Sequence, residues 1–437
     1  MMVSRIQQLS HMALLLFDWL TRDGRLLLAA KMVRTFAYGF LSVILAIYLK
    51  LIGFDEFLIG LILTTTLLNS VIFTLVASIY ADKLGRRKFL ILYAALMSVS
   101  GFIFAVSENY IVLIIAAFIG TINITGAETG AFLTIEQAIL PQALKNLRKR
   151  NTVFAIYNMV GTFAMATGVL LSGLPAVLQQ QLQYFDIVLN HIVSIKLLFV
   201  LYGTLGIVLI GIYLLLSQKI EVRDNQEKQE DEPTQLTKMS FLTPKSRSIV
   251  IRLSGLFAVD SFAGGFMIQS IVSFWFFTRF GADLTTLSYI FSISGVLTAF
   301  SFMGAAKIAD RIGLINTMVF THIPANILII AVAFAPTLQI AVVLYLLRMA
   351  LSQMDVPTRQ SYIVAVVRED ERTASAGITN ISRNVTQSIS PSVTGILINS
   401  LSLSAPFIIG GTLKVVYDIA LFLNFRNVKP PEEEDQQ

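Results

Sequence analysis

Ionisable side chains stand inside long apolar runs of this chain, at spacings that place several of them on common helix faces. Arg348, Asp355 and Arg359 are separated by 7 and 4 residues, close to whole helical turns, so one helix would carry them in a single stripe. Asp355 and Arg359 can pair directly at i and i+4, whereas Arg348 has no partner in its own run. An arginine there suits bidentate contact with a carboxylate or phosphate. The stripe is therefore either a fixed ion pair between helices or a path for a polar solute or proton.

Two further carboxylates lie within apolar runs, where an ionisable group facing lipid would cost several kcal/mol. Glu128 stands between Gly126 and Gly130, and these glycines would allow a neighbouring helix to pack closely over it. Asp260 precedes Gly264-Gly265, a predicted weak point of its helix. Either carboxylate could carry a proton. The alternative is that each is neutralised by an arginine, Arg34 or Arg348.

The composition places these charges in a membrane protein. Of 437 residues, 55% are apolar and 14% are charged, whereas soluble domains carry about 25% charge. The net charge of +6 resides in short clusters between apolar runs, a membrane-topology pattern rather than a nucleic-acid-binding one. The chain has no cysteine and three scattered histidines, so we expect neither a metal site nor a cofactor. Phosphate-loop, metalloprotease and serine-hydrolase motifs are missing, so we expect no catalytic residues and no enzyme.

Twelve apolar segments are long enough to cross about 30 Å of hydrocarbon. They cover about residues 27–50, 56–80, 88–107, 110–138, 152–176, 191–217, 249–278, 284–308, 314–335, 337–366, 373–402 and 405–425. The sequence therefore predicts an all-α membrane protein of two six-helix bundles. The predicted organisation is an interfacial or cytoplasmic segment (1–26), a first bundle (27–217), a cytoplasmic linker (218–248), a second bundle (249–425) and an acidic cytoplasmic tail (426–437).

Lysine and arginine favour alternate loops, and this bias sets the orientation. The first such loop holds Lys83, Arg86 and Arg87, and both chain ends fall on the same side, whereas the other side offers only Lys50 and Arg279 near segment ends. The positive-inside rule then places both termini in the cytoplasm. We expect a multi-pass protein of the plasma membrane.

The two halves repeat each other. The turn Ser78-Ile79-Tyr80-Ala81-Asp82-Lys83-Leu84-Gly85-Arg86-Arg87-Lys88 returns, shortened, as Ala309-Asp310-Arg311-Ile312-Gly313 at an offset of 228. Arg150, Asn158 and Gly173 likewise precede Arg372, Asn380 and Gly395 by 222 residues. Such a duplication predicts pseudo-two-fold symmetry and a midplane cavity between the halves.

With twelve spans, a charged central linker and this turn after spans two and eight, the chain resembles the major facilitator superfamily over about residues 27–425. The resemblance implies a cytoplasmic gate motif, in which the aspartate caps a facing helix and the basic residues pair with acidic groups to join the halves. The gate residues are Asp82, Gly85, Arg86, Arg87, Asp310, Arg311, Gly313 and, by pairing with loop arginines, Glu136. The second copy ends in Leu314-Ile315 instead of a basic pair, which predicts a weaker contact there.

The resemblance also implies that spans one, four, seven and ten line the central cavity. The candidates for a substrate or proton path are then Arg34, Glu128, Asp260, Gln269, Arg348, Asp355 and Arg359. Span twelve is usually peripheral, so we expect Lys414 and Asp418 to form a structural i, i+4 pair with each other. His322 in span nine is expected to be a hydrogen-bonded helix contact.

The function favoured by these features is secondary active transport by alternating access. We expect proton-coupled movement of a small organic or anionic solute by a monomer in a lipid bilayer, with no nucleic-acid partner. An uncoupled facilitator, with purely structural carboxylates, and a non-transporting sensor or scaffold of the same fold are the alternatives.

Overall fold

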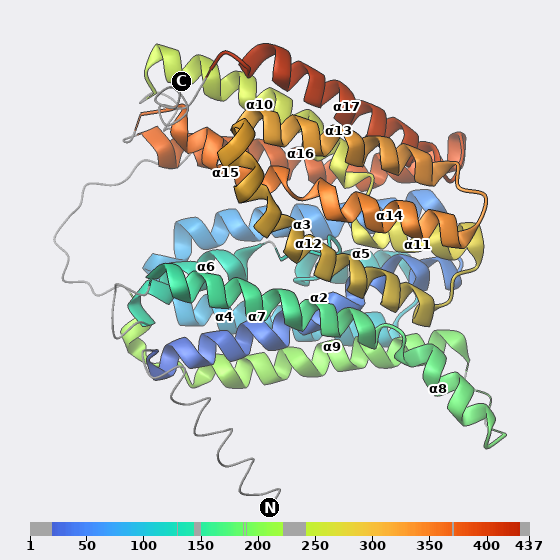
Figure 1. Ribbon diagram of the computed structural model, residues 1–437. Helices are drawn as coiled ribbons and strands as arrows, with labels where there is room; N and C mark the ends of the chain where they lie inside the picture. The colour runs from blue at the N-terminus through green and yellow to red at the C-terminus, as the bar shows by residue number, and fades with distance from the viewer. Residues whose placement is uncertain are drawn as a thin grey trace, which may run out of the picture.

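The computed structural model describes residues 20–128, 130–143, 150–186, 188, 190–221, 242–368 and 371–428. These residues fold into helices and short connections, with the two halves of the chain lying one above the other in Figure 1. Most of the predicted N-terminal segment, central linker and acidic tail lies outside the described residues.

The first half, coloured blue to green in Figure 1, contains eight described α-helices. They are α2 (Arg22–Leu51), α3 (Glu56–Leu84), α4 (Arg86–Val106), α5 (Tyr110–Ile119), α6 (Ala131–Ile139), α7 (Arg150–Leu171), α8 (Leu174–Gln183) and α9 (His191–Leu214). The second half also contains eight. They are α10 (Pro244–Gly265), α11 (Gln269–Phe280), α12 (Leu284–Ile312), α13 (Leu314–Ala333), α14 (Leu338–Ser352), α15 (Asp355–Ala365), α16 (Arg372–Ser400) and α17 (Ala405–Phe425).

Ten helices or helix pairs in the described residues are long and apolar enough to cross a membrane. The other two predicted spans are at their expected places but differ in character. Span four is split into the short helices α5 and α6. Span eleven is the 29-residue α16, which is long enough but rich in serine and threonine. The twelve-span, two-bundle prediction is therefore confirmed.

The duplication is visible in how the helices begin and end. Asp55 caps α3 by accepting the Leu58 N–H at 2.8 Å, and Asp283 caps α12 by accepting the Thr286 N–H at 2.9 Å. These aspartates are again 228 residues apart. At the other end of the same two helices stand Gly85 (φ 110°) and Gly313 (φ 84°). Both have the positive φ that favours glycine, which explains why the repeated motif keeps this residue.

Two predicted helix starts are corrected. α2 begins at Arg22 rather than at residue 27, because the Thr21 hydroxyl accepts the Gly24 N–H and provides an N-cap. α10 begins at Pro244 rather than at 249, with Thr243 as its N-cap and a proline in its first turn. In both cases polar capping residues, which hydropathy alone assigns to a loop, start the span.

Three spans are interrupted near mid-depth. Residues 120–130 separate α5 from α6, residues 266–268 separate α10 from α11, and residues 353–354 separate α14 from α15. The break after Gly264-Gly265 confirms the predicted weak point of span seven. Irregular backbone within a membrane is tolerated only where protein or a water-filled space surrounds it. The broken spans four, seven and ten must therefore face the interior of the protein.

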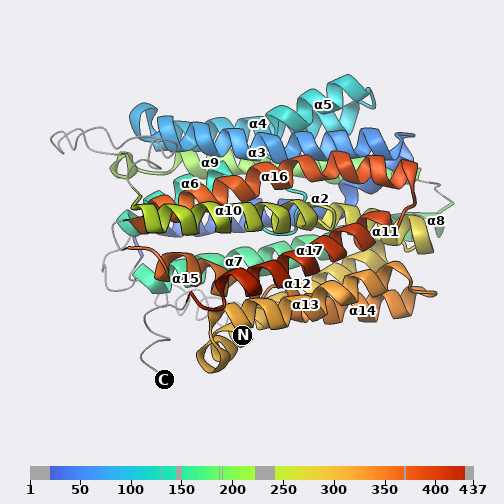
Figure 2. The ribbon, with the colours of Figure 1, turned by 90° about the horizontal axis from the view of Figure 1, so that it is seen from above.

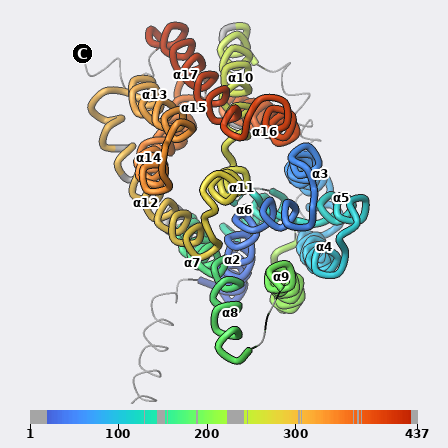
Figure 3. The backbone as a smooth tube through the Cα atoms, turned by 90° about the vertical axis from the view of Figure 1, so that its right-hand side faces the viewer, coloured from blue at the N-terminus to red at the C-terminus, as the bar shows by residue number. Residues whose placement is uncertain are grey.

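The halves meet at one end of the bundle. We call the end that carries the turns at Gly85 and Gly313 the basic end, and the other the opposite end. At the opposite end α2 contacts α11, α3 contacts α16 and α7 contacts α12, and Figures 2 and 3 show the first two of these pairs side by side. The bonds across this boundary are neutral: the Ser270 and Ser273 hydroxyls donate to the carbonyls of Ser42 and Val43 at 2.7 and 2.9 Å. Ser392 also donates from its N–H and its hydroxyl to the Thr64 hydroxyl, at 2.9 and 2.8 Å.

Candidate functional site

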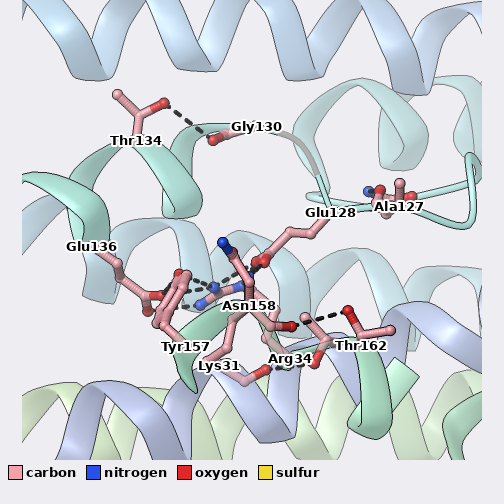
Figure 4. Close-up of polar contacts among 12 residues, drawn as sticks. Lys31, Arg34, Ala127, Glu128, Gly130, Thr134, Glu136, Tyr157, Asn158 and Thr162 are labelled. Atoms are coloured by element: carbon pink, nitrogen blue, oxygen red, sulfur yellow. Dashed lines mark hydrogen bonds and ion pairs between the residues drawn. The ribbon is translucent and has the colours of Figure 1, made fainter. Parts of the chain in front are cut away.

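A group of charged side chains lies inside the first half, between the first, fourth, fifth and sixth spans. This N-terminal charge cluster consists of Lys31, Arg34, Glu128 and Glu136, with the hydroxyls of Tyr157 and Tyr213. Figure 4 shows Arg34 lying between the two glutamates, with Lys31 beside Glu128. Two cations and two carboxylates balance each other here.

Arg34 is the centre of this cluster and is fully buried. Its Nη1 and Nη2 donate to the two oxygens of Glu136 at 2.8 and 2.7 Å, and its Nε donates to Glu128 at 2.8 Å. The hydroxyls of Tyr157 and Tyr213 donate to the same Glu136 carboxylate at 2.5 and 2.7 Å. A bidentate arginine–carboxylate pair with every acceptor filled is the arrangement in which buried charges are tolerated.

Glu136 corrects one expectation. We expected it to pair with loop arginines at the cytoplasmic gate, but it is fully buried and holds Arg34. Glu128 and Glu136 are eight residues apart, so both can face α2 even though the chain between them is partly irregular. Glu128 lies in the 120–130 break, which is held by its own side chains: Asn123 donates to the Ala127 carbonyl at 2.7 Å and accepts the Thr125 N–H at 3.0 Å.

A second group, the C-terminal charge cluster, is formed by Asp260, Asp355, Arg359, Arg383 and Lys414. Asp260 receives Lys414 Nζ at 2.5 Å and Arg383 Nη1 at 2.9 Å, with Arg359 Nη1 at 3.8 Å. Arg359 also pairs with Asp355, which confirms the predicted i, i+4 contact. Asp260 is therefore neutralised by these cations and not by Arg348.

The predicted pair of Lys414 with Asp418 is wrong. Both side chains are buried, but they point to different helices: Lys414 binds Asp260 on α10, whereas Asp418 binds α13. Asp418 contacts His322 Nδ1 at 2.8 Å and accepts from Asn326 Nδ2 at 2.9 Å. His322 is thus a hydrogen-bonded helix contact, as expected. Span twelve carries charges into the interior, and it is not peripheral here.

Arg348 is set apart from this cluster. The break between α14 and α15 ends the stripe that we expected to continue to Asp355, and Arg348 lies on the other side of it. Its guanidinium faces sulfur atoms: Nη1 lies 3.2 Å from Met349 Sδ, and Nη2 lies 3.7 Å from Met267 Sδ at the span-seven break. Only 8% of the residue is exposed. Among the buried lysines and arginines that the structure describes, Arg348 alone has no carboxylate within ion-pair distance.

Gln269 belongs to the boundary between the halves. It begins α11, and its side-chain amide donates to the Ser42 hydroxyl at 2.9 Å. The adjacent Ser270 N–H donates to the Ile124 carbonyl of the broken span four at 3.3 Å. The broken spans of the two halves therefore touch each other directly at this level.

Between the residues that the structure describes, the gate motif makes no contact that joins the halves in this conformation. Asp82 pairs with Arg86 of its own turn at 2.6 Å, and 57% of its side chain is exposed. The backbone N–H groups of Arg86 and Arg87 donate to Glu221 at 2.6 and 3.1 Å. In the second copy, Asp310 and Arg311 are exposed. The described contacts of the first copy thus stay within the first half and the start of the linker, while the opposite end is the one that is closed.

Comparison with known proteins agrees with this architecture. The family model of the Major Facilitator Superfamily matches residues 27–354. The chain belongs to this superfamily. It is a multi-pass membrane transporter of small solutes and not an enzyme.

Individual relatives match more than nine-tenths of the chain. An uncharacterized membrane protein of Saccharomyces cerevisiae is 29% identical over 433 residues, which cover 94% of this chain and 96% of that protein. The nucleoside transporter NupG superposes with a TM-score of 0.72 at 16% identity, covering 93% of this chain and 100% of that one. A D-xylose-proton symporter gives a TM-score of 0.71 at 12% identity, with 93% and 97% coverage. The two structural likenesses establish the fold alone.

Sequence reasoning missed several members of the two clusters. Lys31, Tyr157, Tyr213 and Arg383 were not among the predicted site residues, and Lys414 was given a different partner. The sequence did contain a signal for Lys31 and Arg383, because each is a cation inside a predicted span and must find a counter-charge there. The tyrosines gave no signal, because tyrosine is common in apolar helices.

Proposed function

We propose that this chain is a proton-coupled secondary transporter of a small organic or anionic solute that works by alternating access. It acts as a monomer in the plasma membrane with both termini in the cytoplasm. The observation that carries the proposal is the arrangement of the halves. They are bonded to each other at the opposite end, and spans four, seven and ten, which carry charged residues, are broken near mid-depth. With the basic end in the cytoplasm, this conformation is the inward-facing one.

We assign the proton-carrying role to Glu128. Glu128 and Glu136 share Arg34, so protonation of Glu128 leaves Arg34 with its bidentate partner and leaves Lys31 over the Tyr157 ring at 4.1 Å. Protonation of Asp260 would instead remove the one carboxylate with which both Lys414 and Arg383 form ion pairs in the described part of the chain, which is costly. The relative whose name includes proton symport supports coupling for this fold.

The test is transport in proteoliposomes loaded with a pH-sensitive dye, using a panel of sugars, nucleosides and organic acids. We expect Glu128→Gln to abolish accumulation driven by a pH gradient while it retains exchange of solute across the membrane. Asp260→Asn should instead lower the melting temperature, because it unbalances the C-terminal charge cluster. Wild-type transport that ignores an imposed pH gradient would establish the uncoupled facilitator. Binding without any transport would favour the sensor or scaffold.

A second expectation concerns the gate motif, which we propose joins the halves at the basic end in the outward-facing conformation. Asp82→Asn removes the carboxylate that this contact needs, so the inward-facing population should rise. The chain has no cysteine, so a single Ser70→Cys substitution in the pocket beside Asn123 can report accessibility. Asp82→Asn should speed its labelling by a cytoplasmic thiol reagent, with Lys83→Gln as the control. If the reporter cysteine is labelled at the same rate with and without Asp82→Asn, the motif only sets the orientation of the protein in the membrane and does not join the halves.

A further inference from the structure

Arg348 lies at mid-depth, and no carboxylate in the described part of the chain is within ion-pair distance of it. It is ten residues into α14, which at about 1.5 Å per residue places it near 15 Å from the opposite end. Its neighbours are the sulfur atoms of Met267 and Met349, which are weak acceptors, and its Nε has no partner. A guanidinium removed from water in this way is costly unless a charged partner reaches it. Arg348 therefore forms no ion pair with a described residue in the protein without bound solute.

Unpartnered hydroxyls accompany this arginine. Ser352 lies one helical turn further along α14, is buried, and its Oγ has no partner. Ser301 on the neighbouring α12 is also buried with an unpartnered Oγ. Gly304 of α12 lies beside Met354, two residues past the end of α14, because a Cβ at Gly304 would lie 3.4 Å from the Met354 side chain. Ser301 and Ser352, each within three residues of this contact, are therefore at similar depth in the membrane. One guanidinium and two hydroxyls without a described partner thus lie at similar depth, and the guanidinium reaches Met267 at the span-seven break.

The numbers of cations and carboxylates in the interior of each half also indicate that Arg348 lacks a counter-charge. In the first half the interior cations Lys31 and Arg34 equal the carboxylates Glu128 and Glu136 in number. Within the described spans of the second half, and so without Glu371 at the N-cap of α16, four cations stand against three carboxylates when His322 is counted as neutral. The cations are Arg348, Arg359, Arg383 and Lys414, and the carboxylates are Asp260, Asp355 and Asp418. The excess positive charge corresponds to Arg348.

We infer that Arg348 is the anchor for an acidic group of the transported solute, a carboxylate or a phosphate monoester, with Ser352 completing its hydrogen bonds. This inference rests on the proposed function and narrows its substrate class to anions. The planar fork of arginine holds two oxygens of such a group at once, which a lysine cannot do. A lipid headgroup is not the ligand at this depth, because headgroups lie at the membrane surface.

A ligand-free measurement comes first. If Arg348 is uncompensated in the empty protein, Arg348→Met should raise the melting temperature of the purified protein, by about 2–4 °C. Arg279→Met, at an exposed arginine of α11, is the matched control and should leave it unchanged. A fall in melting temperature for Arg348→Met would show that Arg348 is a structural residue and would overturn the inference.

The ligand measurement uses matched probes: succinate with succinamide, benzoate with benzamide, and glucose 6-phosphate with glucose. At millimolar concentration, at least one anion should raise the wild-type melting temperature while its neutral counterpart does not. Arg348→Gln should weaken the binding of that anion about ten- to a hundredfold. Ser352→Ala should weaken its binding less, and Arg279→Gln should leave its binding unchanged. Equal shifts for the two members of every pair, or an anion effect that survives Arg348→Gln, would overturn the anion site.

The two proposals fail in different ways. Proteoliposomes that carry the neutral probes but not the anions would reject the anion site and leave the transporter. Protein that binds an anion through Arg348 but moves no solute across the membrane would support the site and reject transport.

Discussion

Replacing Arg34 with methionine is expected to lower the free energy of unfolding by about 3–5 kcal/mol, because the substitution leaves buried charges without their partner. Glu136 is fully buried, and Arg34 provides its only cation among the described residues. The hydroxyls of Tyr157 and Tyr213 would remain on it, but neutral donors do not replace a bidentate guanidinium. Glu128 would keep Lys31, so the loss falls mainly on Glu136.

Denaturant or thermal unfolding of the purified protein measures this effect, with Arg279→Met as an exposed-arginine control. The double variant Arg34→Met with Glu136→Met should recover much of the loss, because replacing both members of a buried pair by apolar side chains is often neutral or stabilising. A single variant as stable as the control would show that the cluster contributes little to the fold. Failure of the double variant to recover would place the loss in packing.

The second large effect is expected at the contact between α3 and α16. A Cβ at Gly60 would overlap the carbonyl oxygen of Pro391, and a Cβ at Gly395 would overlap that of Glu56. Gly60→Leu and Gly395→Leu should therefore hinder closure of the opposite end and reduce transport about tenfold. Overpacking of this kind costs about 1–3 kcal/mol, enough to shift the equilibrium between the two conformations by about 5- to 150-fold.

Because these glycines face the other half, each bundle should stay folded in the variants, with an unchanged helical circular-dichroism spectrum. Gly295→Leu on α12 is the control, since a Cβ there meets nothing within 4 Å. Thiol labelling of the Ser70→Cys reporter should become slower from the cytoplasmic side. Variants that transport at the wild-type rate would mean that the opposite end need not close as tightly as it does here.

Much of the architecture could be predicted because hydropathy and lysine and arginine placement act over whole segments. Most span boundaries and the duplicated turn follow from such patterns. The break in span ten was also readable: Pro357 lacks the N–H that would bond to the Gln353 carbonyl, so a helix through residue 353 loses a bond there. Because we expected one continuous helix through span ten, we placed Arg348 on the same helix face as Asp355 and Arg359, whereas the break separates it from them.

Pairing partners were harder to predict, because periodicity gives the face of a helix and not the helix that it meets. Lys414 and Asp418 share a face, yet they bind α10 and α13 respectively. Arg383 was overlooked because α16 is polar along much of its length, so one more polar residue does not stand out. The neutralisation of Asp260 by three different spans depends on tertiary packing that no local pattern encodes.

The bonds across the boundary between the halves have a consequence for the energetics of switching. Every ion pair in the described part of the chain has both members in the same half, whereas the described bonds across the boundary are uncharged. When the halves leave this conformation, no ion pair described at the opposite end has to be broken, and each hydrogen bond lost there contributes only about 0.5–1.5 kcal/mol. The rate at which the opposite end opens should therefore be nearly independent of ionic strength.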